Sequence, residues 1–145
     1  MPKLSYTLKI EPWKKMRYLT AGDYFKTKDG WKIVTADMGN SDYNFLVLIH
    51  ELIELYLTQK HGVTEPRIKK FDEWFEHEKS KGKFKKILSP GRHPKAPYKR
   101  EHMFAVKIED LLRKELGVSR KKQWEVEDKV FEKIKKMFEE RSHKK

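Results

Sequence analysis

The sequence contains no cysteine and is poor in glycine, proline, asparagine and glutamine. Its 145 residues include seven glycines, six prolines, two asparagines and two glutamines. Without cysteine, the chain can form no disulfide, no cysteine-based zinc site and no thiol nucleophile, so histidines and carboxylates are the strong metal ligands that remain. No run approaches the roughly 18 apolar residues of a membrane span, and no signal-peptide core is present. We therefore expect a cytoplasmic protein without a membrane partner.

Charged residues, by contrast, are abundant. They make up 39% of the chain, and 34 Lys and Arg against 22 Asp and Glu give a net charge of +12. Such an excess favours binding to nucleic acid, but the basic residues are interleaved with glutamates, as on a solvated surface. Abundant Lys and Glu with so few amides is typical of proteins from hot environments, so we expect a thermophilic source. The length predicts a single domain, 1–145.

The N-terminal part of the chain, residues 1–39, has the pattern of a small antiparallel sheet. Residues 3–10 alternate between apolar and polar side chains, which is the period of a half-buried strand. Two further strand-like runs, 24–27 and 31–36, flank an Asp-Gly pair, a strong hairpin signal. We expect about three strands here.

The remainder, residues 41–140, is expected to form about four helices, followed by a frayed tail at 141–145. The predicted helices cover residues 41–60, 64–80, 99–116 and 124–138, and a basic, Pro-rich loop covers 81–98. In the third helix one face carries the apolar residues Phe104, Ala105, Ile108, Leu111, Leu112 and Leu116, which we expect to face the core. The fold class is therefore α+β, a small sheet packed on a helical bundle.

The helix predicted over 41–60 carries three ionisable side chains in its most apolar run. His50 and Glu54 lie one helical turn apart, so both should point into the protein. A buried carboxylate costs several kcal/mol unless it is paired, protonated or bound to a cation. The order His-Glu-x-x-Glu also differs by one residue from the zinc-protease motif His-Glu-x-x-His, whose inner Glu is the general base. We predict that His50 and Glu54 bind a divalent metal, with zinc the first choice, and that Glu51 transfers the proton.

A third ligand is needed, because zinc in an enzyme usually takes three protein ligands. The candidates are Glu101 and His102, directly after the Pro-rich loop. Helical phase places Glu101 nearer the middle of the apolar face, whereas imidazole is the commoner third ligand. We favour His102 as the third ligand, with Glu101 hydrogen-bonded to one of the ligands and orienting it. Glu101 itself is the alternative third ligand. His93 and Tyr98 of the loop are candidate substrate contacts.

Three segments together resemble a family of uncharacterised bacteriophage and prophage proteins of similar length. They are Gly22-Asp23-Tyr24-Phe25, His50-Glu51-Leu52-Ile53-Glu54 and Pro94-Lys95-Ala96-Pro97-Tyr98-Lys99-Arg100-Glu101-His102-Met103-Phe104-Ala105. The resemblance implies that the two long helices form one site. The chain is also loosely similar to zincin-type metallopeptidases, which implies a short sheet on the motif helix and a third ligand from a later helix. Glu54 departs from the zincin motif, which has histidine there.

Three functions are compatible with these features. The leading hypothesis is a zinc-dependent hydrolase, metallopeptidase-like by analogy, with an unknown substrate. The second is a non-catalytic protein in which the metal, if present, locks the two helices together while basic residues contact nucleic acid or an acidic partner. Without a metal, Glu51 and Glu54 could instead pair with Arg or Lys from another segment. Those contacts would be Lys83, Lys85, Lys86, Arg92, Lys95 and Arg100. The third is an all-helical nucleotide pyrophosphohydrolase, which the predicted strands and the histidines argue against; its magnesium ligands would be Glu51, Glu54, Glu109 and Asp110.

Overall fold

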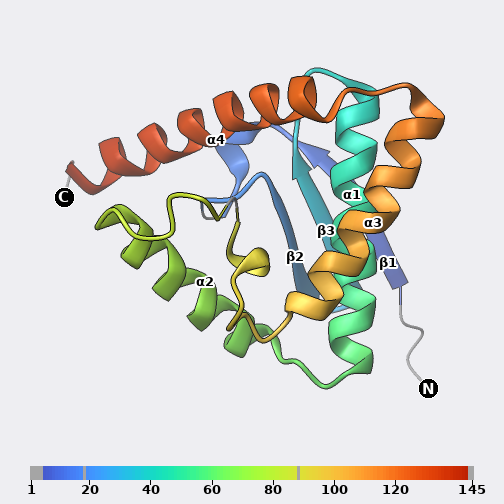
Figure 1. Cartoon of the computed structure of the whole chain (residues 1–145), viewed down its shortest axis with the longest axis horizontal. Coiled ribbons are helices and arrows are strands. Elements are labelled where there is room, and N and C mark those ends of the chain that lie inside the picture. The colour runs from blue at the N-terminus through green and yellow to red at the C-terminus, as the bar shows by residue number, and fades with distance from the viewer. Residues whose placement is uncertain (1–4, 18, 88, 144–145) are drawn as a thin grey trace.

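The computed structural model describes residues 5–17, 19–87 and 89–143, and it has an α+β fold (Figure 1). The strands are β1 (Ser5–Glu11), β2 (Gly22–Thr27) and β3 (Gly30–Ala36), and the helices are α1 (Ser41–Lys60), α2 (Glu65–Ser80), α3 (Lys99–Leu116) and α4 (Arg120–His143). Two short 3₁₀ helices, η1 (Trp13–Lys15) and η2 (Pro90–Arg92), lie in the connections. The predicted class, a small N-terminal sheet with about four helices, is confirmed.

The sheet is mixed, with β3 in the centre between β1 and β2. β2 and β3 form the predicted antiparallel hairpin. β1 instead runs parallel to β3, with Ser5 paired to Gly30 and Glu11 paired to Ala36. The prediction of a wholly antiparallel sheet was therefore wrong at β1. An alternating pattern identifies a strand and its two faces, but it does not specify the direction of the neighbouring strand.

The helix α1 covers one face of the sheet, and local signals explain both of its ends. The Asn40 side chain accepts hydrogen bonds from the backbone N–H groups of Asp42 and Tyr43, at 2.9 and 3.1 Å. The helix ends just before Gly62, whose φ of 73° lies in the left-handed region that favours glycine. Toward the sheet, α1 contributes to one apolar cluster, made of Tyr24, Trp31, Ile33, Leu48 and Leu55.

The helix α3 packs antiparallel against α1 (Figure 1), and its buried face only partly matches the one that its apolar residues predicted. The buried residues of α3 are Glu101, Ala105, Glu109 and Arg113. Phe104, Leu111 and Leu116, which were expected in the core, are exposed. Ala105 is buried as predicted, and so is Glu101. The prediction failed for the large apolar residues because polar side chains occupy much of the seam between α1 and α3, so hydrophobicity alone locates the buried face only in part.

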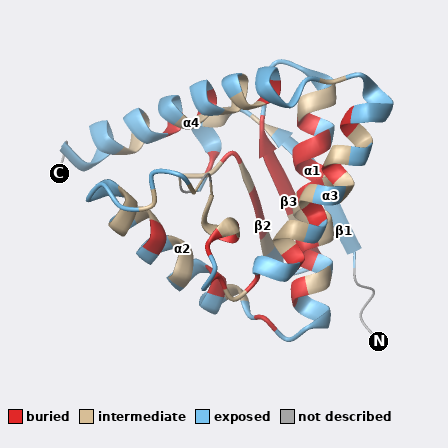
Figure 2. Cartoon of the chain, in the orientation of Figure 1, coloured by how far each residue is buried: buried red, intermediate tan, exposed pale blue. Residues whose placement is uncertain are grey.

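The helix α4 packs on η1 and on the sheet, where Val130 and Ile134 are buried beside Val34. It continues to His143, so part of the predicted frayed tail is helical, and residues 144–145 lie outside the described part of the chain. Figure 2 shows buried residues concentrated where α1, α3 and β3 meet, while β1 is exposed along almost its full length. None of the described helices combines the length and the apolar composition needed to cross a membrane.

Candidate metal centre

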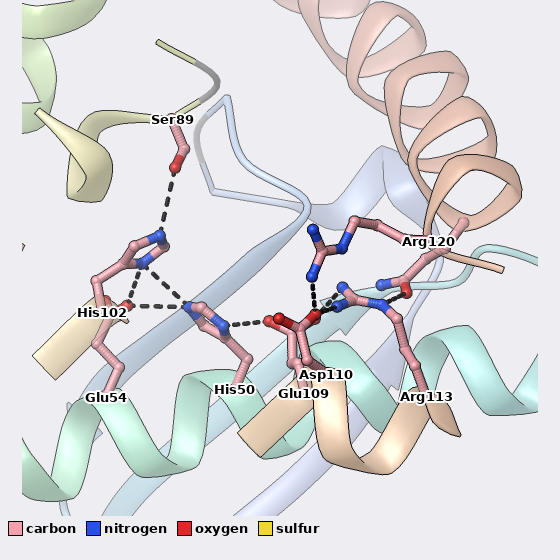
Figure 3. Close-up of polar contacts among 9 residues, drawn as sticks. His50, Glu54, Ser89, His102, Glu109, Asp110, Arg113 and Arg120 are labelled. Carbon is pink, nitrogen blue, oxygen red and sulfur yellow. Dashed lines mark hydrogen bonds and ion pairs between the residues drawn. The ribbon is translucent and has the colours of Figure 1, made fainter. Parts of the chain in front are cut away.

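Three side chains from α1 and α3 converge between the two helices (Figure 3). His50 and Glu54 come from adjacent turns of α1, and His102 comes from the first turn of α3. Nδ1 of His102 lies 2.9 Å from Oε2 of Glu54 and 3.2 Å from Nε2 of His50. Nε2 of His50 lies 3.1 Å from the same Glu54 oxygen. The structure thus brings together the three residues that were predicted as metal ligands.

The spacing of these three atoms suits a tetrahedral zinc ion. Zinc bonds to histidine nitrogen and carboxylate oxygen are about 2.0–2.2 Å long, so two ligand atoms at the tetrahedral angle lie about 3.3 Å apart. The separations of 2.9–3.2 Å are close to that value. The three atoms fall within a group able to hold a metal ion, and two imidazoles with one carboxylate leave a fourth position for water. The residues fit zinc with only a small outward shift.

Two carboxylates, Glu109 and Glu54, contact His50, so the same arrangement favours a positive species at its centre. When His50 donates its Nδ1 proton to Glu109, its Nε2 presents a lone pair toward Glu54 and His102. Burial lowers the pKa of His50, but hydrogen bonds to Glu109 and Glu54 outweigh burial and raise it well above its usual range. Protons therefore balance the charge when no metal is bound. A metal ion would replace them, so binding is expected to release protons.

Glu54 is the anionic member of the cluster. Burial raises the pKa of its carboxyl group, but hydrogen bonds with His102 and His50 outweigh burial and lower it to about 2. Its second oxygen, Oε1, accepts a long hydrogen bond from the hydroxyl of Tyr24 at 3.5 Å. Glu54 is therefore ionised at neutral pH, as a metal ligand must be.

A line of polar contacts holds His50 from behind (Figure 3). Nδ1 of His50 makes a short hydrogen bond to Oε1 of Glu109 on α3. The other Glu109 oxygen accepts a bond from Nη2 of Arg113 at 2.7 Å, and Nε of Arg113 donates to Oε1 of Gln123 on α4 at 2.7 Å. All four side chains are buried. Histidine ligands commonly donate their second N–H to a carboxylate, which fixes the tautomer and the ring orientation.

Sequence reasoning missed this role of Glu109. The residue was named only as a magnesium ligand of the pyrophosphohydrolase hypothesis, yet it follows His102 by seven residues on α3. Seven residues are two helical turns, so Glu109 and His102 share one face. An acidic residue at that spacing was the signal available in the sequence.

The Pro-rich loop holds His102 in place. Nε2 of His102 lies 3.4 Å from Oγ of Ser89, and its ring lies edge-on to the Tyr98 ring, with centroids 6.1 Å apart. Gly91 of η2 lies directly against the imidazole, because a Cβ at this position would be 2.4–2.7 Å from three atoms of the ring. A side chain at position 91 would therefore displace the third ligand.

Glu51 lies beside the cluster and faces β2. Gly22 of β2 leaves space for it, since a Cβ at Gly22 would be 2.7 Å from Oε1 of Glu51. Burial and the negative charge of Glu54 raise the pKa of Glu51 well above its usual range, against the lowering effect of His50. Burial and the neighbouring carboxylate thus favour the protonated form of Glu51 in the metal-free protein.

Glu101 is buried but does not join the cluster. Its Oε1 accepts a hydrogen bond from Nδ1 of His61 at 2.8 Å, and its Oε2 has no hydrogen-bond partner among the described residues. Glu101 and His102 thus turn to different parts of the seam between α1 and α3. The contact predicted for Glu101, orienting a ligand from behind, is made by Glu109.

His93, a predicted substrate contact, lies in an aromatic cluster. Its ring centroid is 4.7–6.0 Å from those of four aromatic residues, Phe71, Trp74, Phe75 and Phe84. Its Nδ1 accepts a hydrogen bond from the backbone N–H of Lys95 at 3.0 Å. Within the described structure, no contact joins His93 to the three ligand residues.

Tyr98, the other predicted substrate contact, is buried behind His102. Its hydroxyl donates to Oδ1 of Asp72 on α2 at 2.5 Å. Burial, followed by the charge of Asp72, raises the pKa of Tyr98 above its usual range. Burial likewise raises the pKa of Asp72, to about 7. This pair links α2 to the start of α3.

The basic residues predicted to contact nucleic acid lie mostly on the surface. Lys83, Lys85, Lys86, Lys95 and Arg100 are exposed. The half-buried Arg92 has its guanidinium 6.0 Å from the centroid of the Trp124 ring, and Lys83 pairs with Glu78 at 2.6 Å.

The surroundings of Asp110 argue against the pyrophosphohydrolase hypothesis. Asp110 pairs with Arg113 and with Arg120. Glu109 is engaged by His50 and Arg113, so neither carboxylate is free to hold magnesium together with Glu54. The sheet is also incompatible with an all-helical fold.

Comparison with known proteins does not extend these findings. No protein-family model, no curated protein and no solved structure matches the chain. The resemblances to phage proteins and to zincins stay predictions.

Proposed function

We propose that the chain is a zinc-dependent hydrolase whose ion is held by His50, Glu54 and His102. One observation carries the proposal: two imidazole nitrogens and one carboxylate oxygen, from two helices, converge at separations close to those between zinc ligands. Zinc, when bound, polarises a carbonyl group and lowers the pKa of a water in its fourth position. Peptide or amide bonds are the proposed substrates by analogy with the motif.

Glu51 is the general base in this proposal. It follows His50 on α1 and lies on the β2 side of the cluster, outside the ligand set. In this role Glu51 takes a proton from water and later passes it to the leaving amine. Gly22 keeps the space that Glu51 occupies free of other side chains.

The residues around the ligands supply pre-organisation. The contact between Glu109 and His50 leaves Nε2 as the nitrogen that faces the centre. Gly91 and Ser89 position the His102 ring from the opposite side. The cluster is therefore held in shape by α3, α4 and the Pro-rich loop together.

The test compares wild type with Glu51→Gln, both loaded with zinc, on a panel of peptide and amide substrates. We expect kcat to fall about 10²–10⁴-fold, the range for loss of a general base, while the bound zinc stays constant. Glu115→Gln, an exposed position on α3, serves as the control and should behave as wild type. Undiminished turnover by zinc-loaded Glu51→Gln would refute the role of Glu51.

A second function is favoured by the exposed basic side chains of the loop. Lys85 and Lys86 directly follow Phe84, whose ring is 5.6 Å from that of the exposed Trp74. Aromatic rings beside cationic groups are a common platform for single-stranded nucleic acid. In this alternative the metal cluster only clamps α1 to α3, and the loop binds nucleic acid or an acidic partner.

Salt dependence distinguishes this alternative. For single strands, the slope of log affinity against log salt is about −0.7 for each phosphate contact. Replacing Lys85 and Lys86 with alanine should therefore make the slope shallower by about one unit or more. Absence of binding to single-stranded DNA and RNA at low salt excludes nucleic acid as the partner in this alternative.

A further inference from the structure

An open groove lies between η1 and the C-terminal half of α4, with a volume of about 410 Å³. It is lined by two large apolar residues, four basic residues and one acidic residue: Trp13 and Met137; Lys14, Lys133, Lys136 and Arg141; and Glu140. We call it the basic groove. Its described lining includes no residue of the metal cluster or of the Pro-rich loop, so a ligand bound there contacts a different part of the molecule.

Trp13 brings an anchored aromatic ring to the basic groove. Its side chain is half-buried and packs against the apolar cluster that contains Met16, Val34 and Val130, and η1 itself packs on α4. The ammonium group of Lys14 lies 5.7 Å from the centroid of the Trp13 ring. Because a lysine side chain is flexible, a flat group that stacks on the ring displaces the ammonium and leaves its charge alongside. Trp13 therefore offers a fixed surface on which a base can stack.

The basic side chains of the groove are not neutralised by their neighbours. Lys14, Lys133, Lys136 and Arg141 are all exposed. Among the described residues, none of these four cationic groups has a carboxylate oxygen within 4 Å, although Glu140 also lines the groove. The guanidinium of Arg141 lies instead 5.7 Å from the centroid of the Phe138 ring. The four charges are therefore available to an anionic ligand.

The basic groove lies at one end of a row of lysines on the exposed outer side of α4 (Figure 2). The lysine row consists of four residues: Lys122, Lys129, Lys133 and Lys136. At about 100° and 1.5 Å per residue, they fall within about 60° of one another around the helix axis, over a length of about 21 Å. The adjacent side, centred about 80° away, carries four acidic residues: Glu125, Asp128, Glu132 and Glu139. Positive charge is therefore gathered along one side of α4.

The groove and the lysine row together complement a strand of nucleic acid. Phosphate groups match the cationic side chains, and a tryptophan ring beside them suits an unpaired base, whose face is free to stack. In a duplex that face is covered by the neighbouring bases, and exposing it costs a few kcal/mol. The lysine row extends for about 21 Å along α4, so it matches a chain of several phosphates better than a single nucleotide.

We propose that the basic groove and the lysine row bind single-stranded nucleic acid. A base stacks on Trp13, and the phosphates on either side of it contact the four basic side chains of the groove. Phosphates further along the strand follow the lysine row. The site is built by η1 and α4, so it is separate from the Pro-rich loop and does not depend on zinc or on hydrolysis. The net charge of +12 supports the approach of a polyanion.

The first test measures the affinity of the full chain for a fluorescein-labelled oligothymidine of about 20 nucleotides by fluorescence anisotropy, across a salt series. Four phosphate contacts at about −0.7 each give a slope of log affinity against log salt of about −3. Lys133→Ala combined with Lys136→Ala removes two contacts, so the slope should become shallower by about 1.4, and affinity near 0.1 M salt should fall at least about tenfold. Lys107→Ala, at an exposed lysine of α3, is the control and should bind as wild type.

The second test locates the stacked base by tryptophan fluorescence. The unlabelled oligonucleotide should quench the wild type, and Trp13→Phe should lose most of this quenching. Trp74→Phe, at the exposed ring packed on Phe84, should keep it.

Two results overturn the proposal irrespective of how the loop behaves: no binding of the oligonucleotide at low salt, and wild-type affinity in folded Lys133→Ala combined with Lys136→Ala. Quenching that Trp74→Phe abolishes and Trp13→Phe retains overturns it as well. Sedimentation with phosphatidylserine vesicles without any binding of the oligonucleotide would identify a membrane surface instead. The lysine positions are exposed, so these variants are expected to fold, and circular dichroism checks this.

Discussion

Replacing Gly91 with alanine is expected to weaken metal binding without altering any ligand. The added Cβ would lie 2.4 Å from Cγ of His102 and 2.7 Å from its Nδ1. Ordinary carbon contacts are about 3.5–4.0 Å, so either η2 or the imidazole must move by roughly 1 Å. Metal sites tolerate deviations of only about 0.2 Å in bond length. A shift of this size therefore takes His102 out of bonding distance.

The expected loss in zinc affinity is about 10–100-fold, comparable with the removal of a group that orients a ligand. Overpacking should also lower the free energy of unfolding by about 1–3 kcal/mol. Zinc affinity is measured by competition with a chromophoric chelator, and stability by urea denaturation of the metal-free protein.

Gly82→Ala is the matched control. Gly82 has a φ of 93°, and a Cβ there would meet no other atom within 4 Å. The control should lose stability through backbone strain, of order 1 kcal/mol, and keep its zinc affinity. Wild-type zinc affinity in folded Gly91→Ala would refute the idea that η2 seats His102. An equal loss of zinc affinity in Gly82→Ala would show that general destabilisation, rather than ligand displacement, is responsible.

Two further substitutions test the surroundings of the cluster. Glu109→Gln should lower zinc affinity about 10–100-fold. It should also lower the free energy of unfolding by about 1–3 kcal/mol, because the amide N–H group of glutamine would face one of the two donors, His50 or Arg113, from which Glu109 accepts hydrogen bonds. Zinc titration and urea denaturation measure the two changes, and the exposed Glu115→Gln is the control that should behave as wild type. Asp72 has a pKa of about 7 in the folded chain against 3.8 in the unfolded chain, so the folded state binds more protons and stability falls as pH rises through this interval. Asp72→Asn should therefore stabilise the metal-free protein by about 1–3 kcal/mol near pH 8 and change little near pH 4, and equal denaturation midpoints near pH 8 would contradict the reasoning.

The sequence predicted those parts of the fold that local patterns control. The hairpin of β2 and β3 follows from an Asp-Gly turn between strand-like runs, and α1 covers the helix predicted over 41–60. The direction of β1 was not predictable, because it depends on the path of the connection that contains η1 and on pairing with β3. Local periodicity carries no information on either.

The candidate site was predictable on α1 and only partly on α3. His50 and Glu54 stood out as ionisable residues in an apolar run, and His102 followed from the chemistry of zinc. The buried face of α3 was misjudged, because that face contains Glu101, Glu109 and Arg113 while large apolar residues of the helix are exposed. Burial of such a polar face can be predicted only when its hydrogen-bond partners on α1 and α4 are known.

The most direct test of the proposed centre is the zinc content of protein purified without added metal and without an affinity tag. Elemental analysis should find about one zinc per chain in the wild type, as expected for a single three-ligand site. The zinc should be lost in His102→Ala and kept in His77→Ala, which removes an exposed histidine of α2. A wild type that binds no zinc, or His102→Ala that keeps stoichiometric zinc, would contradict the assignment of His50, Glu54 and His102 as the metal ligands.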